Sequence, residues 1–372
     1  MQFQRQPRGD KGYPHLPSHW PDFNGDGNVY VSGYGFVHLN PQDIERHEIR
    51  RSASIAGGVM LMLLLLPTVL MLPAQLVVRQ LGAFLTLQST DDLVLWTAIL
   101  EELRTGLWTV GTYLIPIFFL IGIGEREIRQ QESTAFSLQT AFLGLLCALG
   151  VSSVLMAGGE VLGDILQEMN LLVVRDGETL PTATAAVILF LIRLAMTVLL
   201  QEVLLRGLLL RFFRKHGDAF ALMMSSVVSG LIAGTLTGDL SQFAMALVYG
   251  YLLLRTGSLL VPVLGHLLCA FWPVVLQLLV PGRYLGSARS MTALVLIMLG
   301  LIAFALFCRQ DPNAFILSQR SLDYGKLSGR LESGCKSLFP FRRKLGISLT
   351  SAFFSASAAL WLFQAGQNML VL

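Results

Sequence analysis

The feature that most constrains this sequence is a series of apolar blocks, each about 18 to 28 residues long. A block of this length can cross roughly 30 Å of hydrocarbon as an α-helix. Inside a bilayer every backbone polar group needs a partner within the protein, and barrel strands would alternate polar and apolar residues instead of forming unbroken runs. Apolar residues make up 53% of the 372 and charged residues only 14%. We therefore predict an all-α, polytopic transmembrane bundle of about eight or nine spans.

The blocks also predict how the chain is divided. The expected spans lie near residues 54–78, 106–124, 137–161, 184–212, 219–238, 240–255, 258–280, 290–308 and 346–364. The corresponding regions are a mobile cytoplasmic arm (1–52), N-terminal transmembrane helices and loops (53–181), a transmembrane core (182–308), a basic cytoplasmic loop (309–345) and a C-terminal transmembrane helix (346–372). Within the arm, residues 29–39 are expected to be strand-like, and Asn40-Pro41 to begin a helical lead-in.

Positive charge predicts the orientation of the spans, because cytoplasmic loops carry an excess of Lys and Arg. The N-terminal arm and the 309–345 segment are basic, and the loops on the opposite side carry acidic residues such as Asp91 and Asp164. We expect a protein of the cell membrane with a cytoplasmic N-terminus. Membrane lipids are then its first partners, and the basic 309–345 loop can rest on anionic headgroups.

Ionisable groups inside apolar spans are costly, so they are the first place to look for function. Glu202 and Arg206 lie four residues apart on one helix face in the cytoplasmic third of their span. His266 lies in the inner half of another span. Two simpler interpretations stay open: Arg206 reaches the inner headgroups with Glu202 neutralising it, and His266 is a hydrogen-bonding packing residue.

Other kinds of site have no support in the sequence. His266 is the only histidine in any expected span, and the four cysteines form no CxxC pair, so we expect no metal site and no cofactor. No GxSxG motif, phosphate-binding glycine loop or nucleic-acid signature is present, so nucleic acid is not an expected partner.

Three stretches carry a resemblance to a known family. They are QEVLLRG at 201–207, SSVVSGLIAG at 225–234 and YGYLLLRTGSLLVPVLGH at 249–266. Together they resemble the CPBP family, the CAAX-protease and bacteriocin-processing (Abi) intramembrane endopeptidases, whose motifs are EExxxR, FxxxH and HxxxN. The third match is long and specific. The resemblance implies a CPBP-like core over about a quarter of the chain.

The resemblance also implies which catalytic positions have changed. In active relatives the first Glu of EExxxR and the His of FxxxH activate a water molecule, and the later His and Asn stabilise the oxyanion. The first Glu corresponds to Gln201, the His of FxxxH to Ala233 and the Asn to Ala270. The motif positions that are retained are Glu202, Arg206 and His266. A lost general base alone removes about 10²–10⁴ in rate, and a lost oxyanion donor about 10²–10³.

Three functions remain open on this basis. The leading hypothesis is a membrane binding or scaffolding protein with lost or impaired peptidase activity, whose partner is a membrane protein or peptide. The second is an active intramembrane endopeptidase that cleaves membrane or prenylated peptides through Glu202 and His266. Because neighbouring helical residues point about 100° apart, Glu202 would then have to reach round from the expected position. The third is a transporter-like polar pathway lined by Arg193, Glu202, Arg206 and His266.

Overall fold

The structure is a computed structural model that describes residues 28–31, 35–38, 41–86, 93–128, 138–169, 180–181, 184–232, 236–310 and 339–370. A small antiparallel hairpin comes first, with β1 (Asn28–Val31) paired to β2 (Gly35–His38) so that Val29 lies opposite Val37. The strand-like pattern predicted for the arm is therefore confirmed for these residues. A long helix follows directly from Pro41, where the proline fits the first turn because it lacks the N–H that would be unpaired there.

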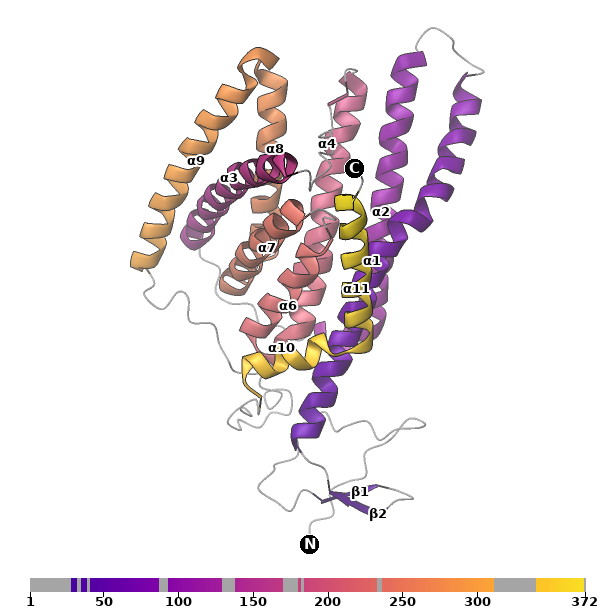
Figure 1. Cartoon of the computed structure of the whole chain (residues 1–372), viewed down its shortest axis with the longest axis vertical. Helices are drawn as coiled ribbons and strands as arrows, with labels where there is room; N and C mark the ends of the chain where they lie inside the picture. The colour runs from indigo at the N-terminus through magenta and orange to yellow at the C-terminus, as the bar shows by residue number, and fades with distance from the viewer. Residues whose placement is uncertain are drawn as a thin grey trace.

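Helices make up the rest of the described chain (Figure 1). In order they are α1 (Pro41–Thr86), α2 (Leu93–Ile128), α3 (Leu138–Glu168), α4 (Thr184–Glu202), the π-helix η1 (Val203–Leu210), α5 (Arg211–Phe213), the 3₁₀-helix η2 (Arg214–His216), α6 (Asp218–Gly230), α7 (Leu236–Thr256), α8 (Leu260–Leu279), α9 (Gly282–Gln310), α10 (Phe341–Leu349) and α11 (Ala352–Leu370). The predicted all-α bundle is thus confirmed.

The number of membrane-crossing helices is lower than the eight or nine expected. Among the described residues, six helices are long and apolar enough to cross a bilayer, and a seventh span is possible if α10 and α11 count as one. The difference lies mainly at 219–238 and 240–255. The helix α6 has only 13 residues, too few at 1.5 Å each to cross the hydrocarbon, and α7 is not among the helices that are apolar enough to cross.

The last expected span is also not a single straight helix. The helices α10 and α11 meet at a bend of 73° around Thr350 and Ser351. In Figure 1, α10 lies across one end of the bundle, at the end where α1 begins, and α11 then runs beside α1. The helix α10 also extends across the boundary expected between the 309–345 loop and the C-terminal span.

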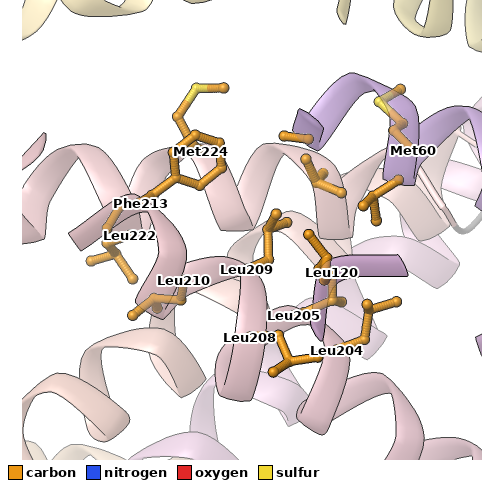
Figure 2. Packing of buried hydrophobic residues seen from close by; sticks show 14 of the residues in the cluster. Met60, Leu120, Leu204, Leu205, Leu208, Leu209, Leu210, Phe213, Leu222 and Met224 are labelled. Carbon is orange, nitrogen blue, oxygen red and sulfur yellow. The ribbon is translucent and has the colours of Figure 1, made fainter. Parts of the chain in front are cut away.

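One large hydrophobic cluster joins the α1–α2 side of the bundle to the core (Figure 2). Met60 of α1 and Leu120 of α2 pack there with Leu204, Leu205 and Leu209 of η1, all of them almost fully buried. On the other side of the molecule α3 packs against α9, α7 and α8. Gly150 and Gly300 allow the backbones of α3 and α9 to touch, since a Cβ on Gly150 would lie 2.7 Å from the Gly300 Cα. Small residues that permit such close approach are typical of helix contacts in membranes.

Candidate functional site

The candidate site begins at the junction between α4 and η1. Glu202 is the last residue of α4, and its side chain is completely buried. Arg206 lies four residues later in η1, is also buried, and places its Nη1 atom 3.2 Å from Glu202 Oε1. The ion pair predicted from the i, i+4 spacing is therefore present. Arg206 does not snorkel to the headgroup region as the simpler interpretation required, because only 2% of its side chain is exposed.

His266 joins this pair from α8. Its Nδ1 atom lies 2.7 Å from Glu202 Oε1, a distance typical of a hydrogen bond to a charged carboxylate. A neutral imidazole that donates from Nδ1 to the carboxylate keeps a lone pair on Nε2. The side chain is 12% exposed, so it is the most accessible member of the group. Glu202 does not have to reach round its helix, because α8 packs against the side of α4 on which Glu202 lies.

Tyr249 of α7 is a member of the site that the sequence reasoning did not single out. Its ring stacks on the ring of His266, with the centroids 5.1 Å apart and the planes 21° from parallel. The Arg206 guanidinium lies over the same ring, 5.6 Å from its centroid. Gly265 packs close to both rings' surroundings, because a Cβ there would lie 3.2 Å from Leu145 Cδ2 and in ordinary contact, at 3.4 Å, with Tyr249 Cε1. The available signal was that Tyr249 begins the long motif that ends at His266.

Three buried polar atoms on η1's neighbours have no hydrogen-bond partner among the described residues. They are Glu202 Oε2 and the hydroxyls of Ser226 and Ser229 on α6, whereas Arg206 Nη1 has Glu202 Oε1 3.2 Å away. Ser226 and Ser229 are completely buried. Unpaired buried polar groups are rare and cost about 1–3 kcal/mol each.

The contacts around Gly250 of α7 place Ser226 at the depth of the ion pair. A Cβ on Gly250 would meet both Leu222 of α6, at 2.5 Å, and Leu210 of η1, at 3.0 Å, so these three residues share one level. Ser226 is one turn from Leu222 and Arg206 is about one turn from Leu210, and both turns lead away from the end of the bundle where α10 lies. The backbone positions of Ser226 on α6 and Arg206 on η1 therefore lie at about the same depth in the bundle.

The matched but substituted positions are only partly described. Gln201 is buried next to Glu202 on α4, and Ala270 is half-buried one turn beyond His266 on α8. Ala233 lies outside the described residues. Gln201 cannot act as a general base, since a carboxamide does not accept a proton near neutral pH.

The other charged residue of the expected polar pathway lies elsewhere. Arg193 of α4 forms an ion pair with Glu102 of α2, with Nε 2.9 Å from Oε2, and its guanidinium lies over the Phe190 ring. About nine residues of helix separate it from Glu202, or roughly 13 Å. Among the described residues, no group of three His, Cys, Asp or Glu side chains could hold a metal ion.

Comparison with known proteins places this site in a family. Residues 183–272 match the family described as "Type II CAAX prenyl endopeptidase Rce1-like". The chain is 25% identical over 201 residues to "Putative membrane peptidase YdiL" of Bacillus subtilis (strain 168), a match that covers 51% of this chain and 80% of that protein. No solved structure matches. The matched segment contains the Glu202–Arg206 pair, Tyr249 and His266, so the resemblance seen in the sequence is confirmed: residues 183–272 of this multi-pass membrane protein are similar to the Rce1-like endopeptidases.

Proposed function

We propose that this protein binds a peptide or a membrane protein segment at the Glu202–His266 site, and that its capacity to hydrolyse peptide bonds is lost or strongly impaired. The observation that carries the proposal is the 2.7 Å contact that holds His266 on Glu202, beside a carboxamide at Gln201 and a methyl group at Ala270. The pair can orient an imidazole toward a bound peptide. Of the four groups that the resemblance implies for activating water and stabilising an oxyanion, three are replaced, by Gln201, Ala233 and Ala270, and His266 is retained.

A peptide backbone is the ligand whose chemistry fits the unpaired atoms best. A peptide unit offers one N–H donor and one C=O acceptor. Glu202 Oε2 and His266 Nε2 can accept from N–H groups, and Arg206 Nη1 can donate to a carbonyl. Binding would therefore give a partner to Glu202 Oε2, which has none among the described residues. The family description directs attention to prenylated peptides with a CAAX ending, which also suit a site reached from the bilayer.

The orientation of the chain belongs to the same proposal. The N-terminus and the end of the bundle where α10 lies face the cytoplasm of the cell, because basic residues such as Arg50, Arg51, Arg342 and Arg343 at that end outnumber those at the other end, such as Arg79 and Arg283. The site then lies in the inner half of the membrane, open to peptides anchored in the cytoplasmic leaflet. Lipids surround the remaining helices, and nucleic acid is not a partner.

The proposal is tested with the full chain reconstituted in nanodiscs and a fluorescent farnesylated peptide that ends in a CAAX sequence. We expect saturable binding by fluorescence anisotropy, weakened about fivefold by His266→Ala through the loss of roughly 1 kcal/mol of hydrogen bonding. Mass spectrometry of the same peptide should detect no cleavage above the rate in empty nanodiscs. The control is His216→Ala, which removes the other buried histidine and leaves the site intact.

Equal binding by the wild type and His266→Ala would refute the proposed peptide site. A second candidate is an active endopeptidase, which the Glu202–His266 contact specifically favours, since a carboxylate that orients an imidazole is the arrangement of a general base and its supporting acid. Cleavage by the wild type that disappears in His266→Ala, but persists in His216→Ala, would establish this second function in place of the first.

A further inference from the structure

The end of the bundle where α1 begins carries a surface that the peptide site does not use. We define the inner-rim surface as Arg50 and Arg51 of α1 together with Arg342 and Arg343 of α10, all four exposed. No acidic side chain among the described residues pairs with any of them. The neighbouring basic residues are different: Arg46 pairs with Asp43, Arg214 with Asp218, and Lys215 with Glu48.

The helix α10 has the two faces expected of a helix that lies in the plane of a membrane surface. Lys344, Ile347 and Ser348 are buried against the protein. Arg342 and Leu349 lie on the opposite face, because seven residues are close to two full helical turns. Both are exposed, Leu349 to 55%. Exposed cations beside exposed apolar groups suit the boundary between headgroups and acyl chains. The 73° bend then lets α11 enter the bilayer.

Buried polar contacts fix α10 in this position. Lys344 Nζ donates a hydrogen bond to the backbone carbonyl of His216, with the two atoms 2.6 Å apart, and lies 3.9 Å from Glu45 Oε1. The imidazole of His216 is in turn hydrogen-bonded to Ser52 Oγ of α1, at 2.9 Å. Through these contacts α10 and α1 are both attached to His216 of η2, the segment that follows η1 along the chain. The arginines of α10 and α1 are therefore held on elements that are fixed to each other.

We propose that the inner-rim surface binds the headgroups of anionic phospholipids in the leaflet that α10 touches. Charge complementarity supports this occupant, because four exposed guanidinium groups without an acidic partner among the described residues, one of them (Arg343) stacked 4.6 Å over the Phe339 ring, lie on elements that also expose apolar side chains such as Leu349. Arginine forms bidentate hydrogen bonds with phosphate, and each basic residue near an anionic surface strengthens binding by about fivefold. This inference does not depend on the proposed peptide site.

The test uses the full chain in a neutral detergent, titrated with dioleoyl-phosphatidylglycerol and followed by native mass spectrometry. We expect tighter binding of this lipid than of dioleoyl-phosphatidylcholine, and a loss of this preference at high salt. Arg342→Gln with Arg343→Gln should weaken phosphatidylglycerol binding about 25-fold, about fivefold for each arginine. The matched control is Arg79→Gln with Arg283→Gln, which removes two exposed arginines near the other end of the bundle and should keep the wild-type affinity.

Three results would overturn the inference. They are equal affinity for the two lipids in the wild type, full retention of the preference in the Arg342/Arg343 variant, and an equal loss in the control variant. Glycerol phosphate serves as a competitor: if it binds as tightly as the lipid, a free phosphate and not a leaflet is the ligand. If the double variant is not monodisperse, the single variant Arg342→Gln, on the fully exposed face, supplies the same comparison with about a fivefold loss.

Discussion

Glu202 is the residue on which the charge balance of the site depends. It is fully buried, and both of its close polar neighbours, Arg206 and His266, approach the same carboxylate oxygen. Its ion pair with Arg206 could be predicted from the sequence, because residues four apart share a helix face. Its contact with His266 could not, since it depends on which side of α4 the later helix α8 covers. The stacking of Tyr249 on His266 depends on tertiary packing in the same way.

The first prediction concerns the buried ion pair. Glu202→Gln removes one charge and leaves Arg206 buried without its partner, so we expect a loss of about 3–5 kcal/mol of unfolding free energy. Adding Arg206→Met to this variant should recover part of the loss, because the unpaired charge is then removed as well. Reversible unfolding of the detergent-solubilised protein in SDS measures both effects. Additive losses in the double variant would show that the two side chains do not interact.

At the scale of elements, the long apolar blocks predicted most of the membrane-crossing helices, because their length alone matches the thickness of the hydrocarbon. The block pattern could not predict η1, because a largely apolar block has no regular polar side from which a change of helical period could be detected. The π-helix begins directly after Glu202 and contains Arg206, and such segments occur frequently at functional sites. The bend between α10 and α11 was also not predicted, since its Ser and Thr residues also occur within spans.

A second prediction tests the closest helix contact. Gly150→Ala would place a Cβ 2.7 Å from the Gly300 Cα, so α3 and α9 must separate, and we expect a loss of about 1–3 kcal/mol of stability. Gly158→Ala on the same helix is the control, because nothing lies within 4 Å of that Cβ, and alanine should be neutral or stabilising there. Thermal unfolding in detergent compares them. Equal melting temperatures would contradict the close packing of α3 on α9.

At the scale of the whole molecule, the distribution of charge predicts how the bundle sits in the bilayer. Basic side chains such as Arg50 and Arg342 belong to the segments at one end, near the start of α1 and in α10, and acidic ones such as Glu101 belong to the start of α2 at the other. This asymmetry was visible in the sequence, because it needs only the alternation of loops between two sides. The similar depth of Ser226 and Arg206 was not, since it depends on how α6, α7 and η1 are aligned.

The orientation can be measured with single cysteines introduced at the two ends, in a chain from which the native cysteines have been removed. In intact cells a membrane-impermeant maleimide should label Arg79→Cys and should leave Arg50→Cys unlabelled until the membrane is opened, because the positive-inside rule predicts that the basic end faces the cytoplasm. The reverse labelling pattern would show that the chain is inserted the other way.

The central claim is that a peptide-binding site remains where the groups for hydrolysis are replaced. Its most direct test is the rate of peptide cleavage after Gln201→Glu, Ala233→His and Ala270→Asn are introduced together, with the farnesylated peptide as substrate and mass spectrometry as the readout. We predict cleavage at least about 100-fold faster than in the wild type, because a general base alone contributes that much. A restored variant that folds, binds the peptide and still leaves it intact, or a wild type that already cleaves equally fast, would contradict the claim.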